Sequence, residues 1–282
     1  PLLPPQMPGL PRQVPPGRIY EQLRVTLGQR YAVRDIDLAA ADAIAADIVA
    51  IIVACPSALA ADKLVVLDRY LAEGGHLLVL QDGDVVDQNQ LKSELRPTGL
   101  EEWLAAYGIT VGSAYVYDEE AVQVQTSVQT VHTTSGPKVV PVKMPYGFGI
   151  LASGDSLAAD HLVTSGLSQV ALFWAHPLQV GVLPTGLKAE TLVQSSAQAW
   201  LLPNTLSLAM DGDNVRALRA AAIASAPPQP YTLATAFTGT FQPLFPHTNL
   251  VASPGAMVVI ANSELFHNST LGVEASGNSE FA

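Results

Sequence analysis

Residues 49–84 read VAIIVACPSALAADKLVVLDRYLAEGGHLLVLQDGD, and this stretch decides the predicted fold. It opens with one apolar run and closes with a second, at residues 76–81. Between the two runs, Leu64, Leu67 and Leu71 recur at helical spacing, which predicts an amphipathic helix. Continuously apolar strands are typical of the middle of a parallel sheet that helices cover on both faces. The stretch therefore predicts a strand–helix–strand unit of such a sheet.

The same alternation of helix and strand continues on both sides of this unit. The elements predicted for residues 18–118 are helix 19–28, strand 31–37, strand 47–55, helix 57–73, strand 76–81, helix 98–108 and strand 109–118. Helices that alternate with apolar strands favour right-handed crossovers between parallel strands. The predicted fold class is therefore α/β, with a doubly wound, mostly parallel sheet of the flavodoxin-like kind.

The sequence changes character at two points. Residues 1–17 contain seven prolines, which predicts an extended tether. Beyond residue 118, apolar and polar residues alternate, as expected of half-exposed antiparallel strands. We expect three parts: a tether at 1–17, an α/β core at 18–118 and a β-rich part at 119–282. A late apolar strand of the third part, at about 256–263, is expected to rejoin the core sheet.

Composition excludes several classes of function. The chain has 14 basic and 25 acidic residues and a formal charge of -11, with no cluster of Lys and Arg, so nucleic acid is not an expected partner. Cys55 is the only cysteine, which excludes intramolecular disulfides and cysteine-based zinc sites. No apolar run approaches the roughly 20 residues that a membrane-spanning helix needs.

Polar residues follow both buried strands at one predicted edge of the sheet. Pro56 and Ser57 come after the first strand, and Gln81 and Asp82 come after the second. Open α/β sheets bind ligands at the carboxyl ends of their strands, through loops held on a rigid scaffold. These four residues are therefore the predicted ligand-binding site. Ser57 also has the side chain of a helix N-cap. The acidic residues around Asp82 lack the spacing of a calcium loop, so no metal site is predicted.

Gly74 and Gly75 come after the predicted helix and before a strand. A phosphate-binding glycine loop has the opposite order, since it leads from a strand into the N-terminus of a helix. The two glycines are therefore expected to end the helix, with Gly74 in the left-handed conformation that such a position requires.

Cys55 ends a strand just before a helix, as a catalytic nucleophile on a strand-to-helix elbow would. Pro56 follows it directly and lacks the backbone N–H that an oxyanion hole would use. A buried structural thiol is therefore the favoured interpretation. The six histidines are scattered, and no catalytic motif, nucleotide-binding motif or cofactor site is found. No catalytic residue and no cofactor are predicted.

Several segments in order resemble the soluble region of GldG-like (gliding-motility-type) auxiliary proteins of ABC transporters. The first segment contains five features in order. They are an apolar strand that ends in proline, an Asp-x-Tyr before two glycines, a strand that ends in an acidic residue, a helix that ends in Tyr-Gly, and a strand that ends in aspartate. These features are Pro56, Asp68, Tyr70, Gly74, Gly75, Asp82, Leu104, Tyr107, Gly108 and Asp118. The segment with His161, Thr164, Gly166 and Leu167 also follows the pattern. The last segment departs from it, because residues 261–266 read ANSELF where a Gly-Asp-Ser is usual.

The resemblance implies a fold similar to class I glutamine amidotransferases, without their nucleophile. It also implies a non-catalytic accessory domain of an ABC-type transport system, on the extracytoplasmic face of the cell membrane, periplasmic or extracellular. The native chain would be anchored by membrane segments outside this sequence, which begins with Pro1. The expected partners are the transporter's membrane and ATPase subunits or an envelope component. Two alternatives remain open: an amidotransferase-like or hydrolase-like enzyme using Cys55, and a carbohydrate-binding module.

Overall fold

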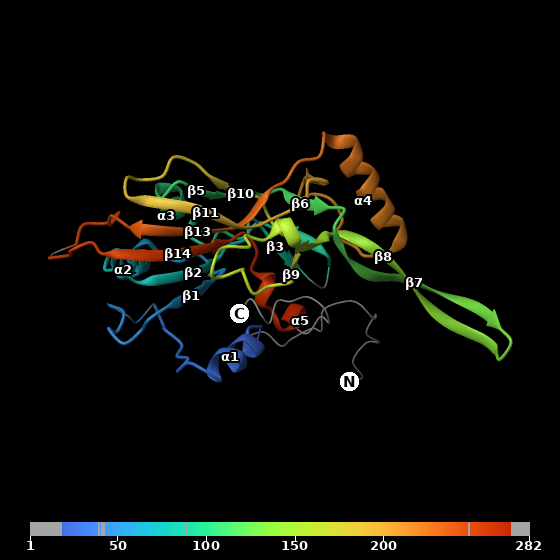
Figure 1. The fold of residues 1–282 in the computed structure, drawn as a ribbon, viewed down its shortest axis with the longest axis horizontal. Coiled ribbons are helices and arrows are strands. Elements are labelled where there is room, and N and C mark those ends of the chain that lie inside the picture. Colours follow the sequence, from blue (N-terminus) through green and yellow to red (C-terminus); the bar gives the residue numbers. More distant parts are fainter. Residues whose placement is uncertain (1–18, 39, 41–42, 88–89, 248, 272–282) are drawn as a thin grey trace.

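The computed structural model describes residues 19–271, except positions 39, 41–42, 88–89 and 248 (Figure 1). The predicted tether at 1–17 lies outside the described residues. The helices are α1 (Glu21–Gly28), α2 (Ala61–Ala72), α3 (Glu101–Ala106), α4 (Gly212–Ser225) and α5 (Asn268–Leu271), with 3-10 turns η1 (Gly154–Ser156) and η2 (Glu264–Phe266). The strands are β1 (Ile51–Ala54), β2 (His76–Leu80), β3 (Val85–Asp87), β4 (Lys92–Glu94), β5 (Ile109–Val111), β6 (Tyr115–Asp118), β7 (Ala121–Thr133), β8 (Gly136–Ser153), β9 (Gln169–Phe173), β10 (Leu178–Val180), β11 (Leu187–Gln194), β12 (Ala199–Leu202), β13 (Thr232–Thr240) and β14 (Pro254–Ile260).

A five-stranded mixed sheet is the centre of the molecule, in the order β1-β2-β14-β13-β11. β1, β2 and β14 are parallel to one another, whereas β13 and β11 run antiparallel to their neighbours. β14 comes from the far end of the described chain and pairs directly with β2, with Leu78 opposite Val258. Three parallel strands therefore end together at one edge of the sheet.

The two faces of the sheet belong to different cores, because successive side chains of a strand point to opposite faces. Leu77 and Val79 of β2 pack with the buried residues of α2 and α3. Leu80 packs on the opposite face with residues of α1, β8, β9 and η2, and Ile260 of β14 lies in the same core. A third core, rich in aromatic residues, fills the space between β6, β8, β12 and α4.

The structure corrects three details of the predicted core. Residues 31–37 form no strand. The strand expected at 109–118 is split at Gly112 into β5 and β6, which pair with β10 and β12 outside the central sheet. β1 is an edge strand, and its Ile52 is 37% exposed. The second place beside β2 is taken by β14, and the antiparallel strands β13 and β11 make the sheet mixed. The doubly wound, mostly parallel class stays a prediction.

Gly74 and Gly75 end α2 in the hydrogen-bond pattern of a Schellman motif. The N–H of Gly75 donates to the carbonyl of Tyr70 at 2.9 Å, and that of Gly74 donates to the carbonyl of Leu71 at 3.1 Å. Gly74 has a φ of +97°, which glycine adopts without steric cost. The predicted role of the glycine pair as a helix end is confirmed. The predicted N-cap Ser57 is wrong, because α2 begins later, after Ala60.

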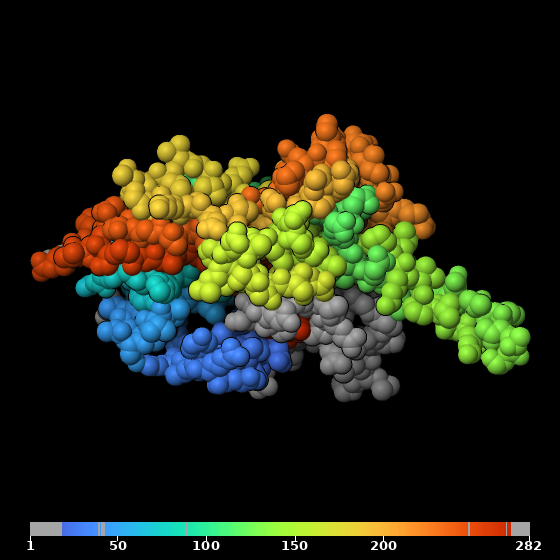
Figure 2. Space-filling model, viewed as in Figure 1, coloured from blue at the N-terminus to red at the C-terminus, as the bar shows by residue number. Residues whose placement is uncertain are grey.

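β7 and β8 form a long hairpin that projects away from the rest of the molecule, at the right of Figure 1. Its outer part is exposed on both strands, and Figure 2 shows it as a narrow extension of the surface. None of the helices that the structure describes is long and apolar enough to cross a membrane.

Candidate functional site

The carboxyl ends of the three parallel strands place polar residues side by side. Cys55 follows β1, Gln81 and Asp82 follow β2, and Ser263 follows β14 by three residues. Backbone hydrogen bonds continue the sheet past the strand ends: the N–H of Cys55 donates to Leu80 at 2.8 Å, and the N–H of Gln81 donates to the carbonyl of Ile260 at 2.9 Å. The edge is thus a rigid frame, as ligand sites of α/β sheets require.

Asp82 joins the ends of β2 and β14. It is 6% exposed, and one carboxylate oxygen accepts the N–H of Ser263 at 2.7 Å. The other oxygen accepts the hydroxyl of the same serine. Buried carboxylates need such partners, because desolvation without hydrogen bonds is costly. Both Asp82 oxygens are therefore occupied by a residue 181 positions away in the chain.

Cys55 combines a strained backbone with a thiol whose pKa is raised. Its φ is +34°, in the left-handed region that few non-glycine residues adopt. Burial, followed by the charge of Asp82, raises the pKa of the thiol from its ordinary value of 9.0 to about 12. A nucleophilic cysteine needs the opposite surroundings, a cation or a base that favours the thiolate. The thiol at this edge is protonated at neutral pH.

Sequence reasoning missed a group of side chains that covers this edge. The hydroxyl of Tyr20 donates to the carbonyl of Ser263 at 3.3 Å, and Nε2 of His267 lies 3.2 Å from the same hydroxyl. Nδ1 of His267 lies 2.7 Å from Glu264. Burial, and then the charge of Asp82, raises the pKa of Tyr20. The sequence carries no signal for this group beyond the expectation that a strand at about 256–263 rejoins the core sheet.

A cavity of about 190 Å³ opens beside Asp82, between the end of β2, α3 and β5. Its lining is mostly apolar; the residues are Gln81, Asp82, Gly83, Leu95, Arg96, Pro97, Glu101, Leu104, Ile109, Thr110 and Val111. The side chain of Gln81 accepts the hydroxyl of Thr98 at 2.8 Å and donates to the carbonyl of Asp82 at 2.9 Å. The structure therefore brings two of the four predicted site residues, Gln81 and Asp82, to one cavity.

Glu101, the first residue of α3, lies on the cavity wall and is held by hydrogen bonds to the residues just before the helix. One of its oxygens accepts the N–H of Thr98 at 2.7 Å, and the N–H of Leu100 donates to the Thr98 hydroxyl at 3.2 Å. Partial burial by itself favours the neutral acid, but these donors, with the N–H of Gly99, hold the pKa of Glu101 below its usual range. The carboxylate is thus an ionised part of the frame.

Pro56 and Ser57 do not line the cavity. They lie on the loop after β1, and the next two residues of that loop donate backbone hydrogen bonds to the cavity rim: Ala58 to Pro97 at 3.0 Å and Leu59 to Thr98 at 2.7 Å. Ser57 is exposed. The structure therefore does not bring these two predicted site residues into the cavity; only the residues that follow them on the same loop contact its rim.

A second buried polar group lies behind the cavity. The imidazole of His176 lies 3.3 Å from the backbone of Asp84 and 3.1 Å from the carbonyl of Ala114. Burial lowers the pKa of His176, so the ring is neutral. Asn204 donates to Asp84. Within the described part of the chain, no three His, Cys, Asp or Glu side chains are placed to hold a metal ion.

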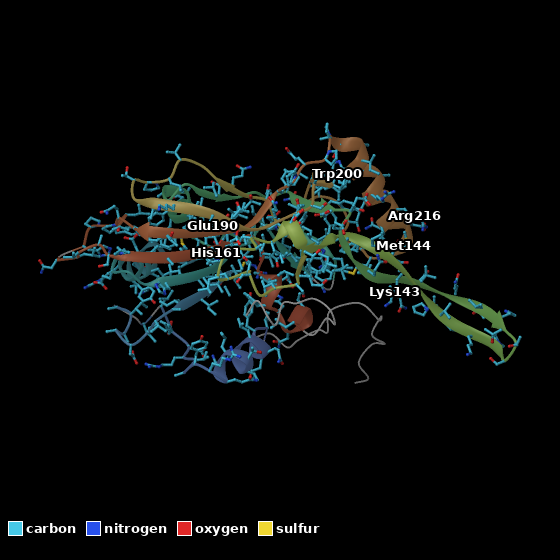
Figure 3. The ribbon with its side chains drawn as sticks, in the orientation of Figure 1. Lys143, Met144, His161, Glu190, Trp200 and Arg216 are labelled. Atoms are coloured by element: carbon cyan, nitrogen blue, oxygen red, sulfur yellow. The ribbon has the colours of Figure 1, made fainter. Side chains whose placement is uncertain are left out.

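A wider hollow of about 740 Å³ lies beside the C-terminal half of α4, near Trp200 in Figure 3. Its polar groups bind one another: Arg219 pairs with Glu119 at 2.9 Å, and the indole N–H of Trp200 donates to the carbonyl of Ala226 at 2.8 Å. The hollow has no frame comparable to the ends of three parallel strands. The edge cavity is therefore the better candidate site.

Asp68, the acid of the Asp-x-Tyr pattern, is a fully buried hydrogen-bond centre rather than a ligand site. Its carboxylate accepts the indole N–H of Trp103 at 3.2 Å and the hydroxyl of Tyr107 at 3.0 Å. It also accepts the backbone N–H groups of Leu244 and Phe245, and His247 lies 3.1 Å away. The aspartate thereby fastens α2 to α3 and to the loop before β14.

A family model described as ABC-type uncharacterized transport system matches residues 9–282. The chain belongs to this family. The family name makes it an auxiliary component of an ABC-type transport system, and its partners are components of such a system.

The remaining comparisons concern the fold. A solved structure described as the mmIFT52 N-terminal domain is similar to this chain, with a TM-score of 0.51 and 14% sequence identity. The match covers 93% of this chain and 86% of the other. At this identity the likeness shows a shared fold alone. A comparison with curated proteins finds no match.

Proposed function

We propose that this chain is a non-catalytic accessory domain of an ABC-type transport system, of the GldG-like type, held on the extracytoplasmic face of the cell membrane. Its edge cavity binds a membrane subunit of the transporter. Family membership supports the transport role. The observation that carries the non-catalytic part is the environment of Cys55, whose thiol lies beside the carboxylate of Asp82 and is held protonated.

The rest of the edge supports the same conclusion. A cysteine hydrolase or amidotransferase needs a base that takes the thiol proton and a donor that stabilises an oxyanion. The imidazole of His267 is engaged with Tyr20 and Glu264, and residue 56 is a proline without an N–H. The edge has the parts of a stable frame rather than those of a reacting site.

Thiol labelling of the native protein tests this assignment. With its pKa raised from 9.0 to about 12, Cys55 should have about a thousandfold less thiolate than a free thiol at pH 8. Labelling should accelerate as the pH rises toward 12, because deprotonation is the limiting requirement, and it should be fast at pH 8 only after denaturation. Fast labelling of the folded protein at pH 8 would revive the enzyme alternative.

The cavity offers an apolar side chain of a partner a place to insert, because leucine, isoleucine and valine line it and its carboxylates are already hydrogen-bonded. Thr110 lies on the wall and is exposed, so Thr110→Trp should fill the cavity without disturbing the fold. The variant is co-expressed with the membrane subunit of its transport system and purified by affinity. It should retain at least about tenfold less of that subunit than the unchanged protein does.

Leu162→Trp is the matched control, because Leu162 is 93% exposed and does not line the cavity. It should retain the membrane subunit as the unchanged protein does. Equal retention by the two variants would exclude the cavity as the contact.

The extracytoplasmic location is tested separately. The variant Leu162→Cys should react with a membrane-impermeant thiol reagent that is applied from outside the cell membrane. Protection from that reagent would contradict an extracytoplasmic position.

A further inference from the structure

The outer part of the β7–β8 hairpin, residues 127–143, is here called the arm. It projects from the body of the molecule in Figures 1 and 2, and its residues are exposed or only partly buried. Val128 on β7 is 59% exposed, and Val139 on β8 is 67% exposed. A two-stranded hairpin without further packing is marginally stable in water. The arm therefore has the form of a segment that is completed by pairing with another strand.

The register of the hairpin determines which amide groups point away from it. Thr133 and Gly136 form the last pair, around a two-residue turn. The pair that flanks such a turn is hydrogen-bonded, and bonded and non-bonded pairs then alternate along the ladder. His132, Thr130 and Val128 on β7 therefore point their N–H groups outward. Their partners on β8, Pro137, Val139 and Pro141, occupy the equivalent outward positions.

The prolines of β8 agree with this assignment. Three prolines of β8 are separated by even numbers of residues: Pro137, Pro141 and Pro145. Each therefore lies at a position where the backbone nitrogen points away from β7. Proline has no N–H, so it occurs in sheets where no ladder bond is needed and it blocks strand addition at an edge. The outer edge of β8 is thus protected against pairing along the whole arm.

Within the arm, the outer edge of β7 has no such protection, because the register irregularities of β7 lie between Ala121 and Ser127, toward the body of the molecule. Residues 121–133, AVQVQTSVQTVHT, contain no proline, glycine, lysine, arginine or acid. Proteins usually protect long edge strands with charges, prolines or bulges in order to prevent pairing. Between residues 19 and 271, leaving aside the undescribed positions, no strand pairs with this edge. One edge of the arm is closed to strand addition, and the other is open.

Charge favours a second copy of this chain as the added strand. Residues 121–153 contain two lysines and no acidic residue, so the excess of acid that gives the chain its charge of -11 lies elsewhere. Figure 3 shows Lys143 and Met144 near the base of the arm, beside Arg216 of α4. Two copies that meet through their arms hold their acidic bodies apart, because the roughly seven residues of β7 in the arm span about 23 Å.

We propose that two copies of this chain associate by pairing β7 with β7 of the second copy, antiparallel about a two-fold axis. The result is a four-stranded sheet in the order β8-β7-β7-β8. Both outer edges of that sheet are the proline-blocked edges of β8, so growth stops at the dimer. A closed two-fold arrangement of this kind is the commonest form of protein self-association.

Sedimentation analysis of the full chain and two proline variants tests the proposal. The unchanged protein should shift with concentration from its mass of 29.7 kDa toward twice that value. Thr130→Pro removes an outward N–H of β7 but no bond of the hairpin, so it should weaken association at least about tenfold. Val139→Pro is the control, because it makes the same change at the paired position on the edge that is already blocked, and it should associate normally.

Hydrogen exchange on the unchanged protein gives a second measurement that does not depend on a variant folding correctly. The amides of Val128, Thr130 and His132 should gain protection as concentration rises, whereas the amide of Val139 should not. A protein that stays monomeric up to high micromolar concentration overturns the proposal. So does equal weakening by Thr130→Pro and Val139→Pro, which would mean that the hairpin as a whole, and not the β7 edge, controls association.

Discussion

Replacing Asp68 with alanine is expected to lower the free energy of unfolding by about 3–5 kcal/mol, the usual cost of removing one member of a buried charged network. The carboxylate is fully buried and accepts hydrogen bonds from Trp103 and Tyr107. Without it, the indole N–H of Trp103 and the backbone N–H groups of Leu244 and Phe245 would lose this acceptor. Denaturant unfolding followed by tryptophan fluorescence measures the loss.

Asp62→Ala is the matched control on the same helix. Asp62 is 68% exposed and pairs only with its neighbour Lys63, so its removal should change the free energy of unfolding by less than about 0.5 kcal/mol. Asp68→Asn should fall between the two, since the amide keeps one acceptor oxygen. If Asp68→Ala were as stable as Asp62→Ala, the buried network would not be the fastening that joins α2 to α3.

Gly83→Ala should destabilise the protein by about 1–3 kcal/mol, the usual cost of overpacking. A methyl group at Gly83 would lie 2.1 Å from the backbone oxygen of Gly112 and 2.8 Å from Nδ1 of His176. The oxygen belongs to the backbone and cannot rotate away, so the segment after β2 must move. Because Gly83 follows Asp82, the displacement should also distort the cavity.

Gly166→Ala provides the comparison, because no atom lies within 4 Å of the position its methyl group would take. Thermal unfolding of the two variants should show a lower melting temperature for Gly83→Ala only. The same preparations can be used to follow the protonation of His176 by NMR, which reports whether the imidazole has left its buried position. Unchanged stability and an unchanged His176 signal would show that the contact is relieved elsewhere.

The candidate site was only partly accessible from sequence. Gln81 and Asp82 could be placed at the carboxyl edge, because a strand and its end are readable from apolar runs and polar residues that follow them. The sequence could not place three further residues at this edge: Tyr20, Ser263 and His267. Ser263 reaches the edge by contacting Asp82, more than 180 positions away, and His267 contacts Tyr20 across 247 positions. Pro56 and Ser57 were placed on the correct loop, but the loop turns beside the cavity rim instead of into it.

What the sequence by itself determined are the features that neighbours along the chain decide. The Schellman end of α2 at Gly74 and the extent of β2 follow from short-range hydrogen bonds and side-chain spacing. What only the tertiary structure decided is which strand lies beside β2, which end of the chain covers Asp82, and that Asp68 fastens three segments. The physical reason is that apolar runs at 76–80 and 254–260 bury equally well in several sheet orders. The choice among those orders depends on how both faces of the sheet pack at once. That packing cannot be read from any single segment of the sequence.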